Sequence, residues 1–548
     1  MPNSNVIDDP TEVTDPLETL EVLIVDPNEV DLERNVRDTV DTESEKFADL
    51  VASIREHGVL QAVSALRYSD GTIRVVHGQR RVLAARQAGA ALPVVVAPDT
   101  ATTEKQRVFD RITGQIDEND VRAEITDGQR SAGLFEMLEL KIPQNKIMKR
   151  LRLKREELKA RAKIGSSQIA RQALDSGQLD FDRAVVVAAF ESEGDSDAVA
   201  RLMDAPAYEF RYVANCILAE REEARERADA AAPWTQRGFT ILATDPDTSG
   251  EGWMHVDRLE HVETGEPATV EVVDADPSLW AVYLTVDEGG LVVVDDTSEV
   301  IDPHLVDWST EGTDPDVEPA EGRYRVDAVT ISDAWVPDYY ILDPAAAGLR
   351  PAATSDDDGD DAGDGDAVSV AERLEAEQRE RERAERRKVI KLNRLGAAAK
   401  ATRIEWLTGY LTRKTPPTSA SRFVAESLAA DALLLNQNRG KSTAVELLGI
   451  DADKLSTRAG LDAFVENLTP NRANVIVLAL VLGAFEARCD KDYWRPHPYS
   501  NTGIPDYLHF LADIGYSLTP IDLVAAGDLD ADEVDAESGT DVSQDLAA

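Results

Sequence analysis

The segment from Val76 to Val96 constrains this chain more than any other part of it. Its residue order predicts a short strand, a glycine at position 78, a helix that begins with two arginines, and a second apolar strand. A glycine lets the backbone come close to a ligand, and the N–H groups at a helix start attract anions. Arg80 and Arg81 add bidentate donors for phosphate. The segment therefore predicts a phosphate-binding cradle; the alternative interpretation is a solvated helix start.

The charge balance limits how this chain can meet nucleic acid. It has 104 acidic against 58 basic residues and a formal net charge of −46. Such a chain repels a phosphate backbone over most of its surface, so any DNA contact needs a local basic patch. The two cysteines, Cys216 and Cys489, imply neither a disulfide framework nor a cysteine-based metal site. The polar N-terminus is unlike a signal peptide and the longest apolar run, Val475 to Phe485, is too short for a membrane span, so we expect a cytoplasmic protein.

A local basic patch does occur between Lys141 and Lys163, where ten basic residues face only two acids. The same block predicts two short helices, 143–151 and 154–164, and paired helices joined by a tight turn are typical of a helix-turn-helix. Many such turns contain a glycine, whereas this one has Arg152 and Leu153, which leaves its geometry open. The alternative interpretation of this basic block is a solvated helix face. We expect DNA contact instead, through Lys146, Lys149, Arg150, Arg152, Lys154, Arg155, Lys159, Arg161 and Lys163.

Four features occur in order: the segment 35–63, the cradle, the run Glu118-Asn119-Asp120-Val121-Arg122, and the basic helices. This set, from about Leu20 to about Glu191, resembles the N-terminal and central domains of ParB, the centromere-binding protein of bacterial chromosome and plasmid partition. The resemblance implies a CTP-binding fold related to sulfiredoxin. It also implies that CTP and Mg²⁺ close a homodimer into a clamp around DNA, after loading at a palindromic parS site, and that hydrolysis reopens the clamp. Such a protein is nucleoid-associated.

The resemblance also implies roles for individual residues. Gly58, Leu60 and Gln61 correspond to part of the nucleotide pocket, and Gly78, Gln79, Arg80 and Arg81 correspond to a Gly-Glu-Arg-Arg phosphate motif. Glu118, Asn119 and Arg122 match a motif that holds the metal and the triphosphate, with Glu118 and Asn119 as metal ligands and Glu118 as the catalytic candidate. Oxygen ligands of this kind suit magnesium.

This sequence departs from the family pattern at three places. Gln79 replaces the family glutamate, which puts CTP hydrolysis in doubt. Ala62 replaces a proline that usually follows the pocket glutamine, which loosens that loop. The N-terminus lacks the basic Leu-Gly-Arg-type segment through which many ParB proteins contact a ParA-type ATPase, so this partner is in doubt as well.

The pattern along the whole chain predicts a multidomain α+β protein. The expected parts are a disordered acidic N-terminus (1–19), a ParB/sulfiredoxin-like α/β nucleotide-binding domain (20–122), an all-helical helix-turn-helix domain (123–232), a β-rich middle domain (233–350), an acidic linker with a charged helix (351–391), a helical C-terminal domain (392–524) and an acidic tail (525–548). In the β-rich domain the aromatic side chains are expected to be core residues, and Thr269 to Ala275 is expected to be a strand.

Other classes of protein share parts of this sequence pattern with a partition protein. A sulfiredoxin needs a reactive cysteine in its phosphate loop, and none lies near Gly78. A ParB-fold transcriptional regulator or nucleoid factor and a ParB-like nuclease or kinase stay open as alternatives. So does an adaptor whose middle and C-terminal domains recruit another protein. Arg439 to Thr443 is similar to the end of a P-loop, but Leu435 stands where the motif needs glycine, so we expect a helix start there. The spacing between His497 and His509 fits no common metal site.

Overall fold

The computed structural model describes residues 20–32, 42–68, 70–101, 103–122, 125–246, 252–310, 316–352, 366–436, 438–450, 462, 464–466, 468–495 and 503–540. The chain divides into two compact units, Met1–Ala205 and Pro206–Ala548, and each is described by itself. Within the described residues no helix is both long and apolar enough to cross a membrane.

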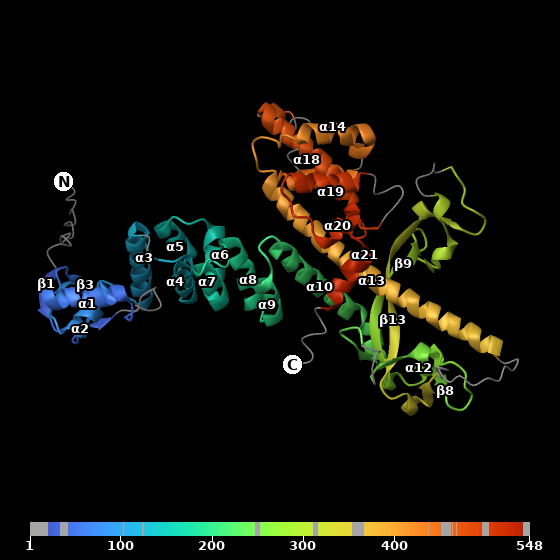
Figure 1. Ribbon diagram of the computed structural model, residues 1–548, viewed down its shortest axis with the longest axis horizontal. Helices are drawn as coiled ribbons and strands as arrows, with labels where there is room; N and C mark the ends of the chain where they lie inside the picture. Colours follow the sequence, from blue (N-terminus) through green and yellow to red (C-terminus); the bar gives the residue numbers. More distant parts are fainter. Residues whose placement is uncertain are drawn as a thin grey trace, which may run out of the picture. The chain divides into compact units, whose positions relative to one another are not determined.

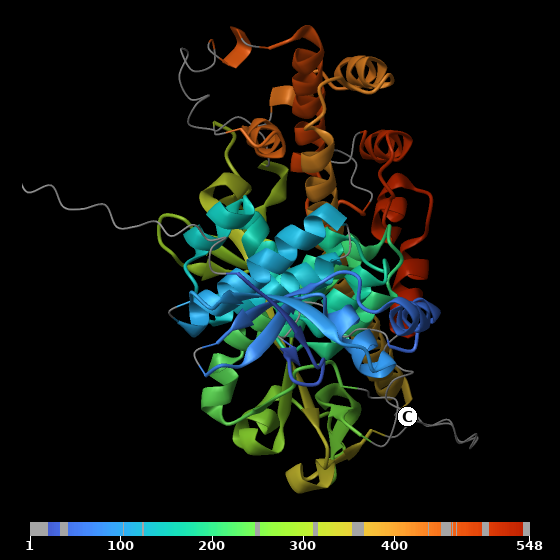
Figure 2. The ribbon, with the colours of Figure 1, turned by 90° about the vertical axis from the view of Figure 1, so that its left-hand side faces the viewer.

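A mixed five-stranded sheet forms the start of the first unit (Figure 1). Its strands are β1 (Glu21–Val25), β2 (Asp31–Leu32), β3 (Val63–Arg67), β4 (Ile73–His77) and β5 (Leu92–Pro98), in the order β1-β5-β3-β4-β2. Strand β5 is parallel to β3 and antiparallel to β1, and β3 and β4 form an antiparallel hairpin. The strands predicted around the cradle are confirmed, and Figure 2 shows this sheet after a 90° turn from the view of Figure 1.

Two helices, α1 (Glu45–His57) and α2 (Gln79–Ala88), cover one face of this sheet. Alternation explains the choice of face, because successive strand side chains point to opposite sides. Val63, Val75 and Val94 are fully buried against Phe47 of α1 and Val82 of α2. The side chains at the alternate positions of these strands point to the opposite face of the sheet and are less covered.

A helical array completes the first unit. Its members are α3 (Glu104–Arg122), α4 (Asp127–Glu139), α5 (Gln144–Leu151), α6 (Arg155–Ser166), α7 (Gln168–Asp175), α8 (Phe181–Ser192) and α9 (Ser196–Asp204). Helix α6 packs closely on α4: a Cβ atom on Gly165 would lie 2.1 Å from the carbonyl oxygen of Ser131. Helix α9 ends before Pro206, where Ala205 is extended because a following proline disfavours the helical conformation.

The second unit begins with α10 (Phe210–Ala230) and α11 (Ala232–Arg237) and continues into the expected β-rich region. Its strands are β6 (Thr240–Ile241), β7 (Met254–His255), β8 (Leu259–His261), β9 (Ala281–Val294), β10 (Val300–Ile301), β11 (Val306–Asp307), β12 (Tyr324–Arg325), β13 (Val329–Ile341) and β14 (Leu349–Pro351). The antiparallel pair of β9 and β13 is its longest part, and a register shift lies between Ser332 and Ala334. Trp280, Tyr339 and Tyr340 are buried, as expected of core aromatics.

One strand prediction in this region is wrong. The segment 270–275 forms helix α12 (Val270–Ala275) instead of a strand. Within this helix Val273 is fully buried, whereas Val270 is 52 % exposed. Tertiary burial of Val273 overrides the β propensity of its neighbours.

The rest of the second unit is helical. Its helices are α13 (Asp366–Tyr410), α14 (Ala420–Ala430), α15 (Asn438–Leu447), α18 (Pro470–Arg488), α19 (Ile504–Asp513), α20 (Pro520–Ala526) and α21 (Ala531–Thr540). Helix α13 runs without a break through position 391, where the charged helix was expected to end. Part of the expected acidic tail forms α21, and its Val534 is buried. Residues 439–443 lie in the start of α15, in agreement with the expectation of a helix start.

Candidate functional site

The predicted cradle is the turn from β4 into α2. Gly78 caps α2 in the left-handed conformation, with φ 97° and ψ 25°. A Cβ atom at this position would lie 2.8 Å from Cγ1 of Val63, the buried first residue of β3. The close approach of the two segments therefore requires glycine. The N-terminal turn of a helix, such as this start of α2, favours anions.

The loop predicted to belong to the nucleotide pocket lies beside this helix start. Gly58 ends α1 with φ 74°, and its N–H donates to the carbonyl oxygen of Ile54 over 2.8 Å. Nη1 of Arg81 donates to the carbonyl oxygens of Gln61, at 2.9 Å, and of Ala62, at 2.7 Å. Leu60 is 85 % exposed at the tip of the loop. The structure thus brings two of the three predicted nucleotide segments together, and Arg81 is the side chain that joins them.

The arginines of α2 differ in what they contact. Arg86 donates to the carbonyl oxygens of Pro27 (2.8 Å) and Val30 (2.7 Å), so it holds the loop before β2. Arg81 holds the loop 60–62. Arg80 is exposed on the first turn of the helix, and Gln79 before it is half-buried. Of these three arginines, Arg80 has the side chain most open to a ligand.

The third predicted segment lies near the end of α3. The backbone of Glu118, Asn119 and Arg122 is helical, and the four-residue spacing places Glu118 and Arg122 on one side of the helix. Their side chains lie outside the described residues, so the metal and triphosphate roles stay predictions. Among the described side chains, no group of His, Cys, Asp and Glu could hold a metal ion.

The sequence reasoning missed a cavity of about 560 Å³ on the open face of the sheet. It is lined by Ser64, Leu66, His77 and Val95 from the strands and by Arg107 and Arg111 from α3. The predicted loop and cradle residues lie outside this lining. The alternation in β3 and β5, with partly exposed Leu66 and Val95, was the one sequence signal for it.

Arg107 joins α3 to the sheet at the edge of this cavity. Its Nε donates to Asp99 over 2.6 Å and its Nη1 to Glu104 over 3.1 Å. The guanidinium carbon lies 5.3 Å from the centre of the Tyr68 ring. The hydrogen bonds to Asp99 and Glu104 raise the pKa of Arg107, so this arginine stays charged.

The basic helices form a pair joined by a three-residue turn, Arg152 to Lys154. Arg152 ends α5 with φ 56° and ψ 34°, the left-handed conformation that glycine commonly supplies at this place. The N–H of Leu153 donates to the carbonyl oxygen of Met148 over 3.1 Å. Ile147 and Leu158 are buried and hold the two helices on a common core with α3 and α4. The turn therefore forms without glycine, at the cost of a strained arginine.

Most of the predicted DNA contacts lie on the surface of this pair. The exposed members are Lys146, Lys149, Arg150, Arg152, Lys154, Arg155, Lys159 and Lys163. Arg155, Lys159 and Lys163 recur every four residues and form one stripe along α6. Lys159 also lies 3.4 Å from Glu156, but both side chains are exposed, and such a pair is weak in water.

Two predicted DNA contacts have side-chain partners on neighbouring helices. Arg161 is 15 % exposed, and it donates to Asp127 over 2.7 Å and to Glu157 over 3.1 Å. Burial opposes its charge, yet the two hydrogen bonds raise the pKa of Arg161. Lys146 donates to Oε1 of Gln106 over 2.6 Å and lies 4.1 Å from the centre of the Phe109 ring. In this structure both side chains attach the basic helices to their neighbours.

Together these features define an α/β domain with a glycine-capped helix start, followed by a helical array with a basic helix pair. Residues 12–109 match the family model of the ParB N-terminal domain, so the chain carries this domain. A comparison with curated proteins found no match.

The chain is also similar to solved ParB structures. One is the C-terminally truncated chromosome-partitioning protein ParB from Caulobacter crescentus complexed with CTP-gamma-S; it has 23 % identity and a TM-score of 0.16, over 34 % of this chain and 99 % of that chain. A second structure of that protein, complexed to the centromeric parS site, has 23 % identity and a TM-score of 0.16, over 33 % and 91 % of the two chains. A Pnob8-like ParB-N domain has 14 % identity and a TM-score of 0.23, over 36 % and 90 %. With TM-scores this low, the domain assignment depends on the family model alone.

Proposed function

We propose that this protein binds a centromere-like DNA site and, with CTP and Mg²⁺, closes as a homodimeric clamp on DNA in plasmid or chromosome partition. The observation that carries the proposal is the helix start at Gly78. It lies inside the segment that matches the ParB N-terminal domain, and a Cβ atom at Gly78 would clash with Val63. The basic helix pair that follows supplies a surface for DNA in an otherwise acidic chain.

At the nucleotide site, the residues fit a triphosphate. The N–H groups at the start of α2 and the exposed Arg80 would contact the phosphates, and Arg81 would keep the loop of Gly58, Leu60 and Gln61 closed on the nucleotide. Glu118 and Asn119 would hold Mg²⁺, which neutralises phosphate charge when bound, and Arg122 would add a further cation. Gln79 cannot take up a proton as a carboxylate can, so Glu118 is the catalytic candidate and CTP turnover should be slow.

At the DNA surface, the stripe of Arg155, Lys159 and Lys163 on α6 would face the duplex. Lys149, Arg150, Arg152 and Lys154 flank it and would neutralise backbone phosphates. Arg161 and Lys146 would support DNA binding indirectly by fixing the position of the helix pair. Arg161 attaches it to α4, and Lys146 attaches it to α3. A palindromic site would suit a homodimer. Such a protein would work at the nucleoid in the cytoplasm, and a ParA-type ATPase would need a contact other than the missing basic segment.

The nucleotide proposal is tested by calorimetry with Mg²⁺ and each of CTP, ATP, GTP and UTP. We expect selective binding of CTP and its loss in Arg80→Ala. The matched control is Arg55→Ala, which removes an exposed arginine from α1. CTP affinity that survives in folded Arg80→Ala would refute the cradle assignment.

The DNA proposal is tested by selection of binding sites from random duplexes and by titration at several salt concentrations. Lys149→Ala with Arg150→Ala should weaken binding and lower the slope of log affinity against log salt by about 2, since each phosphate contact contributes about 0.9. Arg225→Ala, an exposed position on α10, is the control. Binding that is unchanged by the double substitution would exclude the basic helices as the DNA surface.

The remaining candidate functions would use the same residues, and further observations distinguish them from a partition function. A ParB-like nuclease would cleave the DNA when Mg²⁺ is added to the binding reaction. A transcriptional regulator or nucleoid factor would bind DNA without a neighbouring gene for a ParA-type ATPase.

A further inference from the structure

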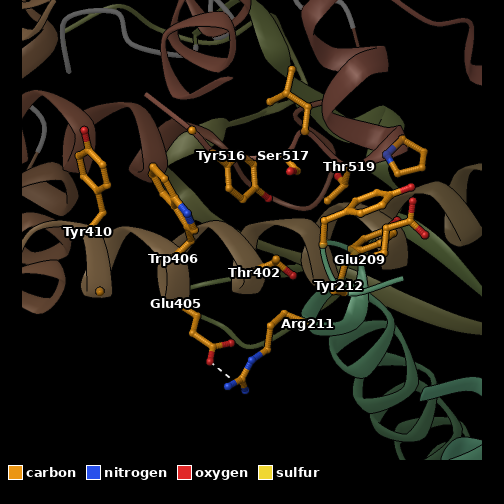
Figure 3. A pocket seen from close by; sticks show the side chains of 16 residues that line it. Glu209, Arg211, Tyr212, Thr402, Glu405, Trp406, Tyr410, Tyr516, Ser517 and Thr519 are labelled. Atoms are coloured by element: carbon orange, nitrogen blue, oxygen red, sulfur yellow. Dashed lines mark ion pairs between the residues drawn. The ribbon is translucent and has the colours of Figure 1, made fainter. Parts of the chain in front are cut away.

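The second unit contains a cavity of about 560 Å³ that no part of the proposed function uses (Figure 3). The start of α10, the last turns of α13 and the loop 515–519 before α20 form its walls. Its lining is rich in aromatic side chains, namely Tyr208, Tyr212, Trp406, Tyr410 and Tyr516.

Three of these rings form a column along α13. The rings of Trp406 and Tyr410 are stacked with centroids 4.6 Å apart, and the ring of Tyr516 lies 5.3 Å from that of Trp406. The guanidinium of Arg413 covers the Tyr410 ring at 4.5 Å and closes the far end of the column. The column already accommodates one arginine, because aromatic faces attract a planar guanidinium.

Carboxylates border the rings. Glu209 lies at the start of α10, and Glu405 lies one residue before Trp406 on α13. Nη1 of Arg211 is 3.0 Å from Oε1 of Glu405, and these side chains are 40 % and 48 % exposed. Figure 3 shows this ion pair below the α13 ribbon, with the Trp406 and Tyr410 rings above it. The surrounding sequence has the same sign: residues 206–548 contain 67 acidic and 31 basic residues. A cationic ligand is therefore attracted both at long range and at the cavity itself.

A buried network fixes the wall that Tyr516 provides. Arg403 of α13 is fully buried and contacts Glu486 of α18, at 2.7 Å, and Asp522 of α20. Asp522 accepts hydrogen bonds from the hydroxyls of Thr519, at 2.7 Å, and Tyr516, at 3.3 Å. Burial raises the pKa of Tyr516, so its hydroxyl remains a donor. The cavity is thus held open by the core and needs little ordering when a ligand enters.

From this geometry we infer that the cavity binds an arginine side chain from a basic segment of a partner protein. The guanidinium stacks against the aromatic wall and pairs with Glu405 and Glu209. In the free protein Arg211 forms an ion pair with Glu405 in place of the ligand. This ion pair breaks when the partner's arginine binds to Glu405.

The role of Arg211 makes the inference testable, because removing this arginine should increase the affinity for the ligand instead of lowering it. The probe is a fluorescein-labelled, glycine-flanked diarginine peptide, titrated against the full-length protein and followed by anisotropy. Arg211→Gln frees Glu405 and should tighten binding by about threefold, in line with the strength of an exposed ion pair. Arg225→Gln changes the net charge equally on the same helix and should leave affinity close to that of the native protein.

Two further substitutions should weaken binding. Glu405→Gln should lower affinity by about fivefold, and its charge-matched control is Glu222→Gln on α10. Trp406→Leu should lower affinity by about tenfold, and the control is Trp308→Leu, which removes a half-exposed tryptophan elsewhere in this unit. Thermal melts of each variant separate loss of binding from loss of fold.

The same peptide with citrulline in place of arginine should not bind, because citrulline keeps the shape and loses the charge. Equal affinity for the citrulline peptide would overturn the inference in favour of an uncharged ligand. Weaker binding by Arg211→Gln, or equal effects of Arg211→Gln and Arg225→Gln, would also overturn it.

Discussion

Gly78 is the residue on which the candidate nucleotide site depends most directly. Its left-handed backbone and the 2.8 Å separation from Val63 are two independent reasons for glycine. Gly89, at the other end of α2, shares the left-handed backbone with φ 67° but has open space around it. A comparison of substitutions at the two glycines therefore separates the energetic cost of backbone strain from that of a steric clash.

Alanine at these positions should have unequal effects. Gly89→Ala should lower the free energy of unfolding by about 1–2 kcal/mol, the cost of a left-handed alanine. Gly78→Ala should lower it further, because Val63 must also move, and it should weaken CTP binding. Urea unfolding of both variants measures the difference. Equal destabilisation would contradict the close approach of β3 to the cradle.

Arginines show that a residue type alone does not define a role. Arg80, Arg81 and Arg86 lie on one short helix, yet two of them hold loop carbonyls and one faces solvent. Arg155 and Arg161 share helix α6, yet the first is exposed and the second is paired with Asp127. Exposure and partners, which depend on the fold, decide which arginine can bind phosphate.

At the scale of elements, the turn between α5 and α6 combines strain with function. Arg152 adopts a left-handed conformation that most side chains avoid, and its side chain is exposed beside the predicted DNA surface. A glycine at 152 would relieve the strain, and it would remove a charge from the DNA surface.

Arg152→Gly should therefore stabilise the protein by about 1 kcal/mol and lower the salt slope of DNA binding by about 1. Arg152→Ala is the matched control, since it removes the charge and keeps the strain. Thermal melts and salt titrations measure the two effects. If both variants had the same melting temperature, the strained turn would not exist in solution.

At the scale of the whole molecule, most of the net negative charge belongs to the second unit, where 67 acidic residues stand against 31 basic ones. The core of this unit also contains charged side chains. Arg403, Glu486 and Asp522 are fully buried and join α13, α18 and α20, which are far apart in sequence. Tyr493 and Tyr507 donate to the two carboxylates. A buried network of this kind depends on every member.

Arg403→Ala should destabilise this unit by about 3–5 kcal/mol, because two carboxylates stay buried without a cation. Lowering the pH should restore part of the loss, since protonation removes those charges and the folded variant then binds more protons than the unfolded chain. Arg422→Ala, which removes an arginine 85 % exposed in an ion pair with Glu426, is the control and should change little. Urea unfolding at several pH values measures both effects. A loss that does not shrink at low pH would exclude uncompensated charge as its cause.

The sequence by itself determined the local pattern of the first unit. The helices α1, α2, α5 and α6, the strands around the cradle, and the position of Gly78 follow from periodicity and from glycine at helix ends. These signals are local, because they arise between residues a few positions apart. The ParB N-terminal domain was likewise recognised from motifs in order along the chain.

The tertiary structure alone decided the rest. It made a helix of Val270–Ala275, continued α13 to Tyr410, and gave Arg81 and Arg161 internal partners. It also built the aromatic cavity from α10 and α13, about two hundred positions apart, and the Arg403 network across 119 positions. Such contacts join residues whose separation along the chain leaves no periodic signal, so only the packed fold can specify them.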